Sequence, residues 1–167
     1  MTVSFREMLA GDVVQLVLQR SQHVTLGLAR PVLSYEDGEE LAEGGPAWSA
    51  LGADGRMLAC FGARYLWPPA GVFTGHAVAW ALLAEGIGAA HLAISRFCAA
   101  RIAESPIARI EAIVRADVAA EACWARLIGL RRRALLRRWG PQGAPHLLYE
   151  RVIPVRAAPQ PDQRGDH

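Results

Sequence analysis

Residues 72–84 form a long apolar run that leads directly into the glycine turn Gly86-Ile87-Gly88. The run has no acidic or basic residue apart from a histidine, and it lacks regular polar alternation. This pattern predicts a strand that is buried on both faces of a sheet. A helical pattern over residues 89–104 begins at once after the glycines and stops before Ser105-Pro106. A buried strand that turns tightly into a helix predicts an α/β domain.

The glycine turn has the local chemistry of an anion site. Backbone N–H groups at the start of a helix have no partner inside that helix, and the helix dipole adds partial positive charge there. Glycines also let a phosphate approach the backbone closely. The alternative is a tight connection with no ligand, which is what a Gly-x-Gly sequence between a strand and a helix often is. A Rossmann site is disfavoured because the third glycine of that motif is missing.

The order of the remaining patterns predicts one domain over residues 1–153, in which helices flank a mixed central sheet. Residues 154–167 are polar and rich in proline, which predicts a disordered tail. Asp12 and Asp117 are the expected N-caps of two helices, and Asp54-Gly55 is the expected turn of a hairpin. The expected helices are 13–18, 37–50, 89–104 and 118–128. The expected strands are 3–9, 48–51, 56–65, 72–84, 110–114, 130–139 and 146–153.

Composition narrows the classes of function. Charged residues are 20% of the 167 residues and the net charge is +2, which does not favour a nucleic-acid binder. Cys60, Cys98 and Cys123 lie in apolar stretches without CxxC spacing, so we expect buried free thiols and no metal site. The N-terminus lacks a signal-peptide pattern, and the apolar runs are too short to cross a bilayer. These features favour a cytoplasmic protein with no membrane association.

Three segments resemble the GCN5-related N-acetyltransferase (GNAT) family, and they follow one another along the chain as in that family. Residues 83–88 read Leu-Ala-Glu-Gly-Ile-Gly and resemble the acetyl-CoA loop of the family, Gln/Arg-x-x-Gly-x-Gly/Ala. Residues 117–130 resemble the last helix of the family, which ends in Gly-Phe. Residues 137–143 and 147–149 resemble its final hairpin. The chain is most similar to a phage-encoded subgroup, described as acyltransferase-like or internal virion proteins, in its Trp80-Ala81-Leu82-Leu83 strand end, Trp124 and Gly140-Pro141-Gln142-Gly143.

The resemblance implies acetyl-CoA as co-substrate and an amine as acceptor. In the family, two central strands splay apart, the pantetheine arm bonds the backbone of one of them, and the diphosphate sits on the glycine turn. Carried over to this sequence, the arm meets Trp80–Leu83 and the diphosphate meets the amides that follow. The implied cofactor-binding residues are Trp80, Leu82, Leu83, Glu85, Gly86, Ile87, Gly88 and Ala89.

The catalytic candidates are His76, Glu111 and Tyr149. An unperturbed imidazole titrates near neutrality, so His76 on the central strand is a candidate base, and Glu111 on the following strand is a second. The alternative for each is an exposed side chain at a strand surface. The family tyrosine that protonates the leaving thiolate aligns with Ala125. Tyr149 could take over that role only if the chain folds it towards the gap between the two splayed strands.

The departures from the family keep a second hypothesis open. Leu83 stands in the place of the family Gln/Arg, and the Glu85 carboxylate would repel a diphosphate. The alternative is therefore an inactive GNAT-fold component of a phage or prophage particle, with phage structural proteins as partners and a virion location. Five arginines, Arg131, Arg132, Arg133, Arg137 and Arg138, form a basic cluster. That cluster fits either the ribose phosphate of CoA or a solvated strand face, and nucleic acid is not favoured.

Overall fold

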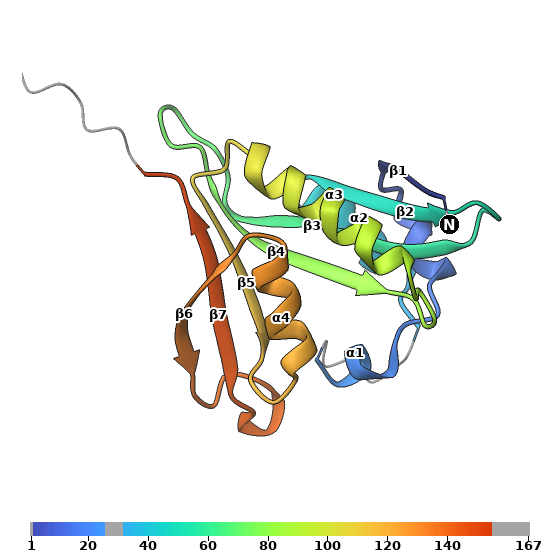
Figure 1. Cartoon of the computed structure of the whole chain (residues 1–167). Coiled ribbons are helices and arrows are strands. Elements are labelled where there is room, and N and C mark those ends of the chain that lie inside the picture. The colour runs from blue at the N-terminus through green and yellow to red at the C-terminus, as the bar shows by residue number, and fades with distance from the viewer. Residues whose placement is uncertain (1, 26–31, 155–167) are drawn as a thin grey trace, which may run out of the picture.

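The computed structural model describes residues 2–25 and 32–154, so the tail predicted for 154–167 lies almost entirely outside the described residues. These residues form a seven-stranded sheet in the order β1-β2-β3-β4-β5-β7-β6, flanked by helices (Figure 1). The expected mixed sheet is therefore confirmed. The strands are β1 (Val3–Glu7), β2 (Ala47–Gly52), β3 (Met57–Trp67), β4 (His76–Leu83), β5 (Arg109–Arg115), β6 (Arg131–Leu136) and β7 (His146–Val152). The helices are η1 (Ala10–Gln15), α1 (Arg20–Thr25), α2 (Tyr35–Glu43), α3 (Ala90–Glu104), α4 (Ala119–Leu127) and η2 (Pro141–Gly143).

The sheet is antiparallel except between β4 and β5, which α3 connects as a parallel crossover. Helices α3 and α4 lie on the same face of the sheet, α3 over the N-terminal strands and α4 over β5 and β7 (Figure 1). Four aromatic rings join α3 to this face: Phe97 stacks on Phe5 with a centroid separation of 4.2 Å and meets Trp48 and Phe61 edge-on. This packing fixes the start of α3 beside the end of β4.

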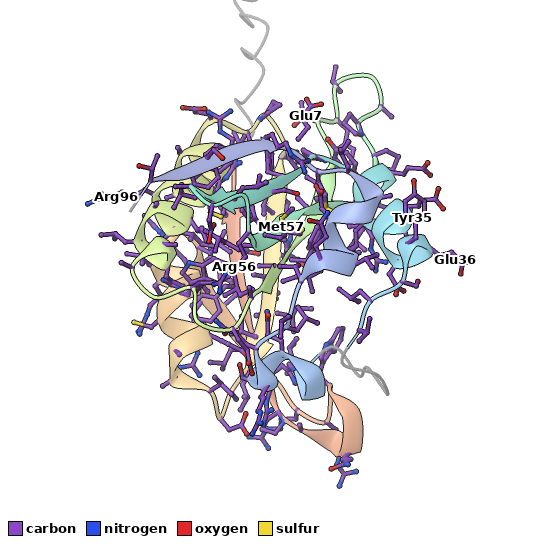
Figure 2. All side chains as sticks on the ribbon, turned by 90° about the vertical axis from the view of Figure 1, so that its right-hand side faces the viewer. Glu7, Tyr35, Glu36, Arg56, Met57 and Arg96 are labelled. Carbon is purple, nitrogen blue, oxygen red and sulfur yellow. The ribbon has the colours of Figure 1, made fainter. Side chains whose placement is uncertain are left out.

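The opposite face of the N-terminal strands carries η1 and α2. Trp48 faces α3, and its neighbour Ser49 therefore points to the other side, since alternate residues of a strand face opposite ways. There the Ser49 hydroxyl donates to Asp12 Oδ2 at 2.6 Å. Met57 is buried within the molecule, whereas Tyr35 and Glu36 at the start of α2 lie at its rim (Figure 2).

Asp12 is not the helix cap that its sequence position predicted. It lies inside η1, for which Leu9 is the N-cap, and the residue is 2% exposed. Arg6 donates to its two carboxylate oxygens at 2.7 and 2.6 Å, and the Leu9 amide donates at 2.9 Å. Burial alone would raise the pKa of Asp12, but the hydrogen bonds from Arg6, Ser49 and Leu9 outweigh it and hold the pKa below its usual value.

The helix expected over residues 37–50 was wrong in its second half. Helix α2 begins after Ser34, which caps it reciprocally with Asp37, and it ends at Glu43. The following Gly-Gly-Pro sequence cannot continue a helix, and Gly45 has φ +155°. The chain enters β2 instead, so Trp48 is a strand residue. The second expected cap was also wrong: Val118 occupies the N-cap of α4, and Asp117 forms an ion pair with Arg115 at 2.5 Å.

Candidate functional site

The strands β4 and β5 pair over only three positions, His76↔Arg109, Ala77↔Ile110 and Val78↔Glu111. Beyond Val78, β4 continues to Leu83 beside β3, and β5 continues to Arg115 beside β7. The two strands therefore diverge, and a cavity of about 1000 Å³ is open between them. This explains why the middle of β4 is only half-buried, although its sequence predicted burial on both faces. The cavity lining includes Trp80, Ala81, Leu83, Ile87, Gly88, His91, Ala112, Val114, Trp124 and Ala125.

The glycine turn borders this cavity and is open to solvent on its outer side. Gly86 and Gly88 adopt φ +68° and +48°, a region that favours glycine, and a Cβ on Gly86 would meet nothing within 4 Å. Ile87 is 4% exposed and holds the turn against the core. Within the described residues, the amides of Gly86, Ile87, Gly88 and Ala89 form no hydrogen bond of standard geometry with a protein acceptor. The turn therefore presents four consecutive free N–H groups at the start of the 15-residue helix α3.

The backbone amides on either side of these four residues are already hydrogen-bonded within the protein. The Glu85 amide donates to the Val17 carbonyl at 2.8 Å, and the Ala90 amide donates to the Ile87 carbonyl at 3.0 Å. Glu85 is exposed. Its backbone N–H is thus unavailable to a ligand, in contrast to the four residues that follow it.

The edge of β4 that faces the cavity is in contact with the segment around α1. Gln22 donates from Nε2 to the Ala81 carbonyl at 2.8 Å, and its Oε1 accepts from the Leu83 amide at 2.7 Å. The Gln19 amide donates to the Leu83 carbonyl at 3.0 Å, and Leu18 forms a bridge with Ala84. The peptide groups of alternate residues in a strand face the same neighbour. Those of Ala79, Ala81 and Leu83 therefore face the cavity, whereas those of Trp80 and Leu82 face β3.

His76 and Glu111 come together where β4 and β5 still pair. His76 Nε2 lies 3.2 Å from Glu111 Oε1 without the alignment of a hydrogen bond, and their side chains are 18% and 12% exposed. Arg109 donates to Glu111 at 2.6 Å and also contacts Glu150 Oε2 at 2.7 Å, and Arg133 donates to Glu150 at 2.6 Å. The sequence-predicted pair thus forms one end of an ionic network that crosses from β4 to β6. Neither residue lines the cavity.

Tyr149 lies on β7, opposite Ala112 of β5, and is 2% exposed. It is not among the residues that line the cavity, although its partner Ala112 is. Ala125, which occupies the place of the family tyrosine, does line the cavity and is also 2% exposed. The structure therefore brings together His76 and Glu111, but not Tyr149.

Three cavity-lining side chains, Gln22, His91 and Trp124, were missed by the sequence reasoning. Trp124 Nε1 donates to Ser95 Oγ at 2.8 Å, and this hydroxyl donates to the His91 carbonyl at 2.7 Å. The ring of His91 lies 5.5 Å from that of Trp124. A helical spacing of four residues between His91 and Ser95 could have indicated a shared face. No sequence signal links Gln22 to β4.

Two of the three cysteines are buried, and the basic cluster lies at the surface. Burial raises the pKa of both Cys60 and Cys98 to about 12. Cys123 is exposed on α4, so the expectation that it is buried was wrong. All five arginines of the basic cluster are exposed, and Arg133 also contacts Glu150. Among the described residues no group of His, Cys, Asp and Glu is arranged to hold a metal ion. The helices among them are too short or too polar to traverse a bilayer.

Comparisons of the sequence with protein-family models and with curated proteins gave no match. Solved structures, in contrast, match over nearly the whole chain. The GNAT domain of PAT from S. lividans superposes with a TM-score of 0.70 at 17% identity and covers 92% of this chain and 92% of its own. This chain has the GNAT fold. An N-acetyltransferase of the same fold from Kribbella flavida gives 0.67 at 16% identity, covering 90% of this chain and 98% of its own.

A third match, spermidine N-acetyltransferase from Vibrio cholerae, was solved in complex with CoA and spermine. It gives a TM-score of 0.64 at 14% identity and covers 90% of this chain and 95% of its own. Such a likeness establishes the fold and leaves function to be argued from the site. The structures named here give no support to a phage-encoded subgroup or to phage partners, which stay predictions.

Proposed function

We propose that this GNAT-fold chain transfers an acyl group, acetyl in the first instance, from acyl-CoA to an amine. The observation that carries the proposal is the divergence of β4 and β5 next to a glycine turn with four free amides. The cavity between these strands, here called the slot, has a volume of about 1000 Å³ and can admit an extended acyl-pantetheine arm. The glycine turn supplies the hydrogen-bond donors for a diphosphate.

The diphosphate binds the amides of Gly86, Ile87, Gly88 and Ala89. Four N–H groups at one helix start complement its negative charge, and the dipole of α3 has the same sign. The Glu85 amide takes no part, because Val17 already accepts from it. The pantetheine arm runs along the cavity-facing edge of β4. On that edge the peptide groups of Ala79, Ala81 and Leu83 replace those of Trp80 and Leu82, which face β3, while Trp80 contributes its side chain as a cavity wall.

The reaction itself needs few groups from the protein. The amine nitrogen attacks the thioester carbonyl, a new C–N bond forms, the C–S bond breaks, and the nitrogen loses a proton. We assign proton acceptance to the His76–Glu111 pair acting through water, because neither residue lines the cavity. The nitrogen and oxygen of the pair lie 3.2 Å apart where β4 and β5 still pair. An alkyl thiol has a pKa of about 8.5, so the CoA sulfur can leave as a thiolate without a side-chain acid. Tyr149 takes no part, because it is buried outside the slot.

A thermal-shift titration with CoA tests the cofactor half of the proposal. At a ligand concentration 100-fold above Kd, binding adds about 2.7 kcal/mol of stability, which raises Tm by about 5–10 °C for a domain of this size. Adenosine, which lacks the diphosphate and the arm, serves as control ligand and should leave Tm unchanged. If millimolar CoA also left Tm unchanged, the cofactor proposal would fail. The fold would then remain with a structural or interaction role.

A further inference from the structure

The side chain of Gln22 occupies the stretch of β4 that the proposed function gives to the pantetheine arm. We propose that Gln22 is an internal competitor for this edge, so that acyl-CoA binds only after the Gln22 side chain has swung out of the slot. The inference rests on the proposed function and adds to it a residue that sets the affinity for the co-substrate.

The contact is specific and two-sided. The carboxamide of Gln22 donates to the Ala81 carbonyl at 2.8 Å and accepts from the Leu83 amide at 2.7 Å. Both distances are those of well-formed hydrogen bonds. The partners are 59 and 61 residues away in the sequence, so this is a tertiary contact and not a local turn.

The chemistry of the contact is that of the ligand itself. A pantetheine arm carries two secondary amides, each with one N–H donor and one C=O acceptor. A glutamine side chain ends in a carboxamide that offers the same pair. The Leu83 amide has a single proton and satisfies one acceptor at a time, so Gln22 and a pantetheine amide exclude each other at this atom.

Release of the Gln22 side chain does not require the neighbouring backbone to move. The bridge between Leu18 and Ala84 and the bond from the Gln19 amide to the Leu83 carbonyl are backbone contacts that do not involve Gln22. Gln22 is itself only partly buried, so rotation about its side-chain bonds can bring the carboxamide into water. The Gln22 carboxamide then exchanges its two hydrogen bonds to β4 for two hydrogen bonds to water.

The Gln22→Ala variant tests this directly, by calorimetric titration with CoA. The loss of both hydrogen bonds removes the competitor, so CoA should bind Gln22→Ala about tenfold or more tightly than the wild type. The matched control is Gln15→Ala. Gln15 is exposed, and its side-chain contact is a long hydrogen bond of 3.5 Å to the Gly11 carbonyl in its own turn. The Kd of CoA for Gln15→Ala should therefore equal that for the wild type.

Amide hydrogen exchange gives a second measurement that does not depend on affinity. Leu83 should exchange faster in Gln22→Ala than in the wild type, and CoA should restore its protection. Unchanged or weaker CoA binding by a folded Gln22→Ala protein would overturn the inference while leaving the proposed function standing. Weaker binding would make Gln22 a ligand contact instead. If neither protein bound CoA, the proposed function would fail, and the inference with it.

Discussion

Asp12 is the most heavily bonded side chain in the described part of the molecule. Its carboxylate accepts four hydrogen bonds, from two atoms of Arg6, from Ser49 and from the Leu9 amide, and so ties η1 to β1 and β2. The sequence indicated a role for Asp12 at a helix start but not this one, because its partner Ser49 is 37 positions away. Short-range patterns identify caps, and they carry no information on tertiary partners.

The Asp12→Asn variant should lose about 3 kcal/mol of stability at neutral pH, because it breaks a buried charged network. Because the pKa of Asp12 is lowered in the folded state, its stabilising effect is present above the usual Asp pKa of about 3.9. It is lost as the pH falls through the folded pKa. Urea unfolding should therefore show a gap between wild type and variant that is constant from pH 5 to 8 and closes below about pH 4.

The control for Asp12→Asn is Asp54→Asn. Asp54 is exposed in the β2–β3 hairpin, where Asn-Gly is as favourable as Asp-Gly, so the midpoint of unfolding should hardly change. Equal midpoints for Asp12→Asn and the wild type at pH 7 would contradict the structural role assigned to Asp12.

The thiols should differ sharply in reactivity. At pH 8 a thiol with a pKa of about 12 has a thiolate fraction on the order of 10⁻⁴, and both Cys60 and Cys98 are buried as well. Iodoacetamide should therefore modify Cys123 alone in the native protein and all three cysteines after unfolding, as mass spectrometry would read out. Rapid native labelling of Cys60 would contradict the packing of η1 over β3.

The catalytic assignment is tested by two substitutions with opposite expectations. His76→Ala should lower kcat by about 10²–10⁴-fold if the imidazole accepts the proton of the amine. Tyr149→Phe should leave kcat within about threefold of the wild type, because Tyr149 is only 2% exposed, whereas the His76 side chain is 18% exposed and accessible to water. The reverse result, measured with an amine acceptor that the protein acetylates, would return the catalytic role to Tyr149.

Elements with a strong local pattern could be predicted from the sequence. The apolar run, the two glycines and the helix that follows became β4, the open turn and α3, because strand burial, positive φ and helix start are all encoded within a few residues. The helix expected over 37–50 was wrong because apolar spacing was given more weight than the Gly44-Gly45-Pro46 interruption. The contact of Gln22 with β4 could not be predicted, since it joins segments about 60 residues apart.

The stacking of α3 on the sheet is testable at the level of this element. Phe97→Ala removes a ring that stacks on Phe5 at 4.2 Å and meets Trp48 and Phe61, which should cost about 2–3 kcal/mol in urea unfolding. Leu92→Ala on the same helix removes a side chain that is 52% exposed and should change stability by less than about 0.5 kcal/mol. Similar losses for the two variants would mean that α3 is not held by this aromatic cluster.

At the scale of the whole molecule, function follows from where the sheet opens. One half consists of β1–β4 with α3 and the other of β5, β7 and β6 with α4, and strand pairing between the halves is limited to three positions of β4 and β5 (Figure 1). The GNAT resemblance implied this divergence. The identity of the amine acceptor could not be predicted, because residues 20–50 carry no motif that specifies a substrate.

The central claim is that the free amides of the glycine turn receive a diphosphate, and a backbone NMR titration of the ¹⁵N-labelled protein with CoA tests it most directly. Pantetheine, which lacks the diphosphate, is the control ligand. The account predicts that CoA shifts the amide resonances of Gly86, Ile87, Gly88 and Ala89 more than any others, and that pantetheine leaves these four in place. Unshifted turn amides at saturating CoA, or shifts confined to the basic cluster on β6 and the loop after it, would contradict it.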